Sequence, residues 1–496
     1  MVRFAQDKRV VIGYVPIRRD MFPAGPAIEL EKEVRARFET MAESCGDVAL
    51  VPIDEAVDGG MLWDVRDVDG IVEYFRKKKV DAVALIHCNF GQEEAAAKLA
   101  KELDKPVLLW GPRDPSPESD TSGKTGPRDY DTQCGMFATS RALSRYQVKF
   151  SYIENCWLDS EALDKGFKEF VGVVSVVKAF KGMRIGQVGT RPRQFLSVKI
   201  NESELLSKFG IEIVPIWPEE VKTMVEKLKW SIEPEPEGCE IRFGKPALDT
   251  DREQNPDPRV KEIAEEIEAN LDYSAIGHEA VVKMAYLEVA LMDLAKINKC
   301  SAIAIDCWGF SQEAYGIASC FVLGDLFDRG LPAACETDIH AAISSVLLQA
   351  AARYASPSFI ADVTIRHPEN DNAELLWHCG PFAKSLARKG TERFIKDGKG
   401  MYEIEHGPIT VARLDQENGE YFLLADEGEG IDGPKTTGNY VWFQVKDWVK
   451  WEKKLMYGPY IHHVSGIHGN YAKILKEASK YLGHITHDSV EPVEEF

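Results

Sequence analysis

Two acidic residues in the second half of the chain follow apolar runs and could bring their carboxylates together. Glu336 comes directly after the run LPAAC, and Asp362 lies in the run FIADV. Two carboxylates at one place repel each other and raise at least one pKa, unless a cation lies between them. A divalent metal ion satisfies both groups, so the pair predicts a metal site.

Histidines are concentrated after these acids. Nine of the 11 histidines follow Glu336, and imidazole joins carboxylate in many sites for borderline divalent metals. The densest group is YIHHVSGIHG; in a strand-like stretch neighbouring side chains point to opposite faces, so we expect His462 and His463 not to bind one ion. His378, in LLWHCG, is a further candidate ligand. Each acid by itself is more simply interpreted as a helix cap or a solvated residue. The matched placement of the two acids, together with the histidines that follow them, makes a metal site an equally good interpretation.

The segment between the two acids has the pattern of one helix between two strands. Apolar residues recur at helical spacing over residues 339–354, and Thr337 or Asp338 can cap this helix. A strand, helix and strand in this order predict a right-handed crossover between neighbouring parallel strands. Glu336 and Asp362 would then lie at equivalent strand ends, on the edge where open α/β sheets bind ligands.

Earlier in the chain, apolar runs of strand length alternate with helical patterns, which predicts parallel sheets. The helices are expected at residues 28–45, 67–78, from 91, 133–146, 159–181, 202–209, 218–229, 257–270 and 278–298. Beyond about Pro368, short alternating strands with Gly and Asn turns indicate an antiparallel region.

We therefore predict an α/β protein with two doubly wound parallel-sheet domains followed by a smaller, mainly antiparallel β domain. The first domain would span residues 1–181, and the second, residues 182–355, would carry Glu336. The third, residues 356–496, would carry Asp362, His378 and His463.

The composition narrows the class of partner and the compartment. A net charge of -20 repels phosphate backbones and anionic lipid, so we expect neither nucleic acid nor a membrane as partner. The amino terminus lacks the pattern of a signal peptide, and no run approaches the roughly 20 apolar residues of a membrane span. Ten cysteines without a C-x-x-C pair suit a reduced, cytoplasmic protein.

These residues resemble the L-fucose isomerase and L-arabinose isomerase family of metal-dependent aldose-ketose isomerases. The resemblance is carried by ACETDIHAAISSVLLQ, by FIADV at the family's spacing after the glutamate, by HCG, and by HHVSGIHG before the final helix. It implies that Glu336 and Asp362 bind the metal and also transfer protons, and that His463 is the imidazole ligand. His378 resembles a further histidine that arabinose isomerases use at the metal and fucose isomerases lack.

The resemblance also implies a cofactor and an assembly. The metal would be Mn²⁺, with Mg²⁺ or Co²⁺ as alternatives, and the protein a hexameric or trimer-based homo-oligomer whose first domain completes a neighbour's site. Arg18, Asn89 and Phe90 would contact substrate across that interface, and Gln312 from the same chain. The chain is shorter than typical fucose isomerases and has HCNF where the family has a tryptophan, so the identity of the sugar is not inherited.

The expected function is a metal-dependent aldose-ketose isomerase that acts on a free, unphosphorylated sugar through an enediolate intermediate. Glu336 and Asp362 would be the general acid and base, in an order that the sequence leaves open. A metal-dependent epimerase, lyase or aldolase on a related polyol would share this chemistry. A non-catalytic sugar-binding protein is the alternative from another class, because paired α/β domains around a cleft also occur in sugar binders.

Overall fold

A computed structural model describes residues 2–115, 129–230, 255–310, 316–494 and 496. The chain forms two compact units, one made of Lys8–Lys178 and Glu494–Phe496, the other of Met1–Asp7 and Ala179–Val493. The three-domain division stays a prediction. Among the helices of the described ranges, none combines the length and the apolarity that crossing a bilayer requires.

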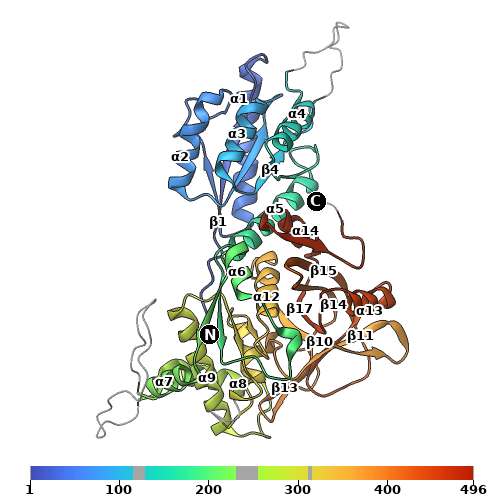
Figure 1. Cartoon of the computed structure of the whole chain (residues 1–496). Helices are drawn as coiled ribbons and strands as arrows, with labels where there is room; N and C mark the ends of the chain where they lie inside the picture. Colours follow the sequence, from blue (N-terminus) through green and yellow to red (C-terminus); the bar gives the residue numbers. More distant parts are fainter. Residues whose placement is uncertain (1, 116–128, 231–254, 311–315, 495) are drawn as a thin grey trace. The chain divides into compact units, whose positions relative to one another are not determined.

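The unit of Lys8–Lys178 contains a parallel sheet with helices on both faces (Figure 1). Its strand order is β2-β1-β3-β4-β5. Alternate residues of β1 pack on opposite sides: Ile12 and Tyr14 contact α1 and α5, whereas Val11 and Val15 contact α2 and α3. A strand buried on both faces is the pattern that parallel sheets require. The elements are β1 Val10–Ile17, α1 Ala24–Ser44, β2 Val48–Pro52, α2 Val68–Lys78, β3 Ala82–His87, α3 Glu93–Leu103, β4 Val107–Trp110, α4 Thr132–Arg145, β5 Ser151–Tyr152 and α5 Glu161–Phe180.

The second unit begins with another parallel sheet, of strand order β7-β6-β8-β9. From β6 the chain passes to β7 on one side and later to β8 on the other, so the ends of β6 and β8 form a topological switch point. The helices expected at 202–209, 218–229, 257–270 and 278–298 are present within one residue of their predicted bounds, and the one expected over 339–354 ends three residues earlier. The elements are β6 Arg184–Val188, α6 Glu202–Phe209, β7 Glu212–Ile216, α7 Pro218–Lys229, α8 Pro258–Asn270, α9 His278–Ile297, β8 Ala302–Ile305, α11 Cys320–Asp328, β9 Ala333–Ala334 and α12 Ile339–Ala351.

The same unit ends in a nine-stranded, mostly antiparallel sheet (Figure 1). Its order is β12-β13-β16-β11-β10-β17-β14-β15-β18, and only β13 with β16 and β15 with β18 pair in parallel. The antiparallel region expected beyond Pro368 is therefore present, and it includes β10, which begins earlier. The elements are β10 Phe359–His367, β11 Asn370–His378, β12 Phe394–Lys396, β13 Lys399–Glu403, β14 Gly407–Glu417, β15 Glu420–Ile431, β16 Asn439–Gln444, α13 Trp448–Tyr457, β17 His463–His468, α14 Ala472–Leu482 and β18 Ile485–Asp488.

The predicted strand-helix-strand unit around Glu336 is wrong in one respect. The strands β9 and β10 are not neighbours in one parallel sheet: β9 pairs with β8, whereas β10 lies between β11 and β17 and is antiparallel to both. The helix α12 is present, and it is capped by Asp338, whose carboxylate accepts a hydrogen bond from the amide of Ala341. This helix is buried throughout and packs against β8 on one side and β14 and β17 on the other. It therefore joins the two sheets: in its first turn the carbonyl of Ala341 accepts a hydrogen bond from Ser465 of β17, and the helix also contacts β10.

Candidate active site

Four side chains predicted as metal ligands converge where the two sheets of the larger unit meet. The Nε2 atom of His463 lies 3.1 Å from Asp362 Oδ1 and 3.7 Å from Glu336 Oε2. The Nε2 atom of His378 lies 3.6 Å from Glu336 Oε2 and 3.9 Å from Asp362 Oδ1. We call this group the acid-imidazole cluster, made of Glu336, Asp362, His378 and His463.

Strand pairing explains how residues so far apart in sequence meet. Asp362 of β10 stands directly opposite His463 of β17 and, on its other side, opposite Trp377 of β11, the neighbour of His378. Glu336 comes from the turn between β9 and α12, where its backbone has a φ of 52°. A non-glycine residue in this left-handed region is uncommon and occurs often at functional sites.

The charges of the cluster are stabilised despite burial. Burial opposes ionisation of Glu336 and Asp362, yet the close approach and positive charge of the two histidines outweigh it and lower the pKa of both carboxyl groups. Burial also opposes protonation of His463, but Asp338 and Asp362 raise its pKa to about 9. Burial likewise opposes protonation of His378, but Glu336 and Asp362 outweigh it and raise its pKa. The acids and the imidazoles thus stabilise each other's charged forms, and the two carboxylates favour positive charge between them.

The residues present fit a divalent metal ion. Within the described part of the chain, Glu336 Oε2 and Asp362 Oδ1 are buried and accept no hydrogen bond, and both face the imidazole nitrogens. Two carboxylate oxygens and two imidazole nitrogens form a ligand set suited to borderline divalent ions. Cys335 Sγ also lies 3.2 Å from His378 Nε2, but burial raises the pKa of this thiol well above its usual range, and a neutral thiol is a poor ligand.

His462 does not behave as strand alternation predicts. Its Nε2 atom lies 3.7 Å from Asp362 Oδ1, so both adjacent histidines approach the same oxygen. The reason is that β17 begins at His463, and His462 precedes the strand. His462 is about half exposed, whereas His463 is buried, so only His463 lies within the cluster.

Two further charged residues hold His463 in place, and the sequence analysis assigned them no role at the site. His463 Nδ1 lies 2.8 Å from Asp338 Oδ2, and Arg413 Nη1 donates to the same oxygen at 2.6 Å. All three side chains are buried. The sequence pattern had indicated only a helix cap for Asp338. For Arg413, a single arginine within the apolar run ITVARL was the one feature that could have indicated a buried charge at the site.

Aromatic side chains close the cluster on another side. Trp308 Nε1 donates to Glu336 Oε1 at 3.0 Å, and the indole stacks on Phe195 with ring centroids 5.9 Å apart. Phe195 stacks in turn on His462, at 5.5 Å. These rings line one side of the cluster and hold Glu336, while Trp308 itself is about half exposed. Gln312, predicted to contact substrate from the same chain, lies outside the described residues.

The three remaining predicted substrate contacts lie together in the other unit, at the carboxyl ends of β1 and β3. The Arg18 guanidinium lies 4.8 Å from the ring centroid of Trp63, and the Arg19 guanidinium 4.1 Å from that of Phe90. Asn89 is fully buried, and its side chain bonds the backbone of Arg19 and Gly91. Its amide thus braces the turn after β3, and the predicted contacts with substrate across an interface stay predictions.

Comparison with known proteins gives two matches to models of one family, at the two ends of the chain. The model described as fucose/sulfoquinovose isomerase, N-terminal domain, matches residues 13–181, and that described as L-fucose isomerase, C-terminal domain, matches residues 378–487. The chain belongs to the L-fucose isomerase family. The resemblance stated from the motifs is therefore confirmed, and this family member is a sugar isomerase.

Several curated relatives of this L-fucose isomerase family member carry one name, sulfoquinovose isomerase. Those of Priestia aryabhattai and Priestia megaterium are each 25% identical over 428 residues, which cover 84% of this chain and 85% of the relative. That of Alkalicoccus urumqiensis is 24% identical over 479 residues, covering 94% and 96%. Among solved structures, the glycosyltransferase SnogD from Streptomyces nogalater superposes with a TM-score of 0.15 at 12% identity, over 70% of this chain and 94% of that chain. This value bears on neither fold nor function.

Proposed function

We propose that the protein is a metal-dependent aldose-ketose isomerase that acts on a free sugar through an enediolate intermediate. The observation that carries the proposal is the pair of buried oxygens on Glu336 and Asp362 that accept no hydrogen bond from any described residue and face two imidazoles. Mn²⁺ is the metal that we propose, with Mg²⁺ and Co²⁺ as alternatives. When bound, the ion would act as a Lewis acid that stabilises negative charge on the sugar oxygens.

The two carboxylates suit the proton transfers of this reaction. Isomerisation moves one proton from C2 to C1 and another from the C2 hydroxyl to the C1 oxygen. Both transfers occur at adjacent atoms, and Glu336 and Asp362 approach the same pair of imidazole nitrogens. One carboxylate can therefore serve the carbon and the other the oxygens, and general acid-base catalysis of this kind contributes typically 10²- to 10⁴-fold.

The neighbours of each carboxylate support a division of labour. Glu336 is held by the indole N–H of Trp308, and its side chain is 7% exposed. The Asp362 side chain is 20% exposed and is the more open of the two. The indole and Phe195 would position Glu336 beside the reacting carbons.

A substrate panel followed by NMR in D₂O tests the proposal. The Mn²⁺-loaded protein is incubated with aldohexoses and aldopentoses, and with sulfoquinovose because the curated relatives carry that name. We expect ketose to form from at least one aldose, activity to cease with EDTA, and Mn²⁺ to restore it. An epimer without ketose would indicate an epimerase, shorter fragments a lyase or aldolase, and no exchange at C2 a binding protein.

Substitution of the acids tests their roles. Glu336→Gln and Asp362→Asn should each lower kcat by about 10²-fold or more. The matched control is Glu403→Gln, because Glu403 is equally buried and accepts from His406 at 2.8 Å but lies outside the acid-imidazole cluster. We expect that variant to retain kcat within about twofold. A Glu336→Gln protein with wild-type turnover would refute the assignment.

A further inference from the structure

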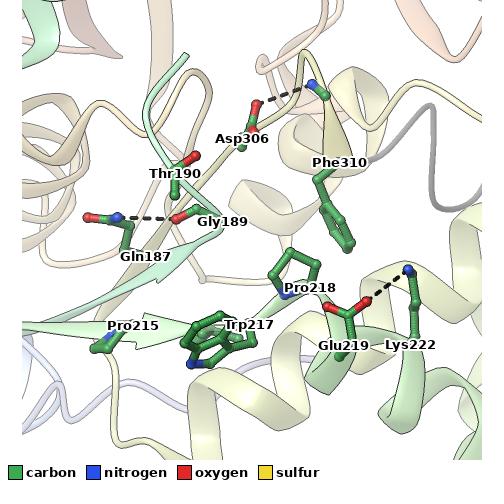
Figure 2. A pocket seen from close by; sticks show the side chains of 12 residues that line it. Gln187, Gly189, Thr190, Pro215, Trp217, Pro218, Glu219, Lys222, Asp306 and Phe310 are labelled. Atoms are coloured by element: carbon green, nitrogen blue, oxygen red, sulfur yellow. Dashed lines mark hydrogen bonds and ion pairs between the residues drawn. The ribbon is translucent and has the colours of Figure 1, made fainter. Parts of the chain in front are cut away.

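A cavity of about 740 Å³ opens along the carboxyl edge of the second parallel sheet (Figure 2). Its walls come from the residues that follow β6, β7 and β8, together with the first turns of α7. It includes Gly189 and Asp306, which end the strands on either side of the topological switch point. Ligands of open α/β sheets bind at such points, and none of the roles assigned above uses this cavity.

The cavity begins one strand away from the acid-imidazole cluster. Ile303 and Ala304 of β8 pair with Ala333 and Ala334 of β9, and the amide of Thr337 donates to the carbonyl of Ile305. Asp306 and Glu336 therefore follow neighbouring strands at the same edge. Because such strands are roughly 5 Å apart, Gly189 lies at about two spacings, ~10 Å, from Glu336. A six-carbon sugar whose first two oxygens bind at the cluster is longer than one strand spacing, so its remaining carbons would extend toward the cavity.

One loop contributes residues to both the acid-imidazole cluster and the cavity. Asp306, Gly309 and Phe310 line the cavity, and Asp306 Oδ1 accepts a hydrogen bond from the amide of Gly309. From the same loop, Trp308 reaches in the other direction and donates to Glu336. A ligand that spans the cluster and the cavity would thus contact this loop on both sides.

The lining combines apolar side chains, among them Trp217 and Phe310, with polar groups that suit a hydroxylated and uncharged chain. Asp306 offers acceptors, while Gln187 and Thr190 carry groups that both donate and accept. The one basic side chain of the lining, Lys222, lies 3.2 Å from Glu219. Among the lining residues, no cation therefore pairs with the Asp306 carboxylate. A phosphate or sulfonate has only acceptor oxygens and negative charge, so it would be repelled at Asp306.

We propose that this cavity receives the part of an open-chain hexose beyond its reacting carbons, with Asp306 accepting hydrogen bonds from its hydroxyl groups and disfavouring an anionic end. The inference rests on the proposed function, which places C1 and C2 at the acid-imidazole cluster. It makes Asp306 a residue that determines specificity for chain length and charge. On this proposal the protein does not prefer the sulfonated sugar that its relatives are named for.

The test compares three aldoses that share the configuration at C2 to C4 of the best sugar in the panel: a pentose, the hexose, and the hexose with a sulfonate on C6. We expect the wild-type protein to prefer the hexose to both others in kcat/KM. Asp306→Asn keeps an acceptor for the Gly309 amide but removes the charge. It should lower the hexose-to-pentose ratio of kcat/KM about tenfold and raise the sulfonate-to-hexose ratio.

Mn²⁺ affinity and a matched control separate this effect from damage to the cluster. Asp306→Asn should bind Mn²⁺ with unchanged affinity in calorimetry, and Glu212→Gln, which removes an acid at the opposite edge of the same sheet, should leave both ratios unchanged. Equal losses on pentose and hexose, or a wild-type preference for the sulfonated sugar, would overturn the inference and leave the proposed function standing. Absence of turnover on every aldose would overturn both.

Discussion

His463 is held at both ring nitrogens, and this fixes what each nitrogen can do. Nδ1 faces Asp338 Oδ2 at 2.8 Å, so a proton on Nδ1 is shared with that carboxylate. Nε2 then points at Asp362 and Glu336. A carboxylate that orients a metal-binding imidazole in this way typically raises its basicity and fixes its tautomer. The buried Arg413 holds Asp338 in turn.

At the scale of this residue, Asp338→Asn should weaken Mn²⁺ binding about 10- to 100-fold, because an amide neither fixes the Nδ1 proton nor balances Arg413 as a carboxylate does. Titration of the metal-free variant with Mn²⁺ by calorimetry measures the loss. Asp447→Asn is the matched control, since Asp447 likewise caps a helix, α13, through the amide of Lys450. If both variants bind Mn²⁺ as the wild type does, Asp338 has no positioning role.

At the scale of the element, α11 packs closely against the segment that follows β11 and His378. Gly324, inside α11, faces the backbone just beyond His378: a Cβ atom there would lie 2.3 Å from the carbonyl oxygen of Phe382 and 2.4 Å from that of Gly380. Backbone atoms cannot give way as the end of a flexible side chain can. The helix and the 380–382 segment thus pack only because residue 324 has no side chain.

Gly324→Ala should therefore destabilise the protein by roughly 1–3 kcal/mol, although alanine is the better helix former. The comparison is Gly70→Ala in α2, where a Cβ atom would contact nothing within 4 Å. That variant should gain about 0.5–1 kcal/mol, since alanine reduces the conformational freedom of the unfolded chain. Scanning calorimetry measures both, and a stabilised Gly324→Ala protein would show that α11 can move away from the segment.

At the scale of the whole larger unit, a buried ion network ties distant segments together. Arg329 donates to Glu288 of α9, to Asp325 at 2.8 Å, to Glu266 of α8 at 3.1 Å, and to the carbonyl of Val2. The side chains of Arg329, Glu288 and Asp325 have no exposed surface. Burial opposes ionisation of Asp325, but positive charge from Lys384 and Arg329 outweighs it and lowers its pKa.

Arg329→Met should cost about 3–5 kcal/mol at neutral pH, because it leaves buried acids with too little positive charge. Asp325 contributes stability above its ordinary pKa and loses it as the pH falls, so the difference from wild type should narrow in acid. Arg366→Met, which breaks an exposed pair with Glu452 at 3.2 Å, should cost less than about 1 kcal/mol. Urea unfolding at several pH values compares them, and equal losses would contradict the network's role.

The sequence by itself determined the helices, the parallel and antiparallel regions, and the acids and histidines that meet. Helical bounds such as 202–209 and 257–270 follow from apolar spacing and caps, which are local properties of the chain. The convergence of Glu336, Asp362 and His463 was predicted from residue types and from family motifs. That His462 and His463 do not bind one ion stays a prediction, but its basis was wrong: strand alternation applies only once the strand has begun, and His462 precedes it.

Only the tertiary structure decided which strands pair and what surrounds the acids. The backbone N–H and C=O groups of β10 can form hydrogen bonds with any free strand edge. Its antiparallel pairing with β11 and β17 therefore depends on residues far along the chain. For the same reason the contact of Asp338 with His463, the indole on Glu336, and the cavity beside Asp306 carry no local signal. Each arises from side chains distant in sequence, brought together by the packing of α12 between two sheets.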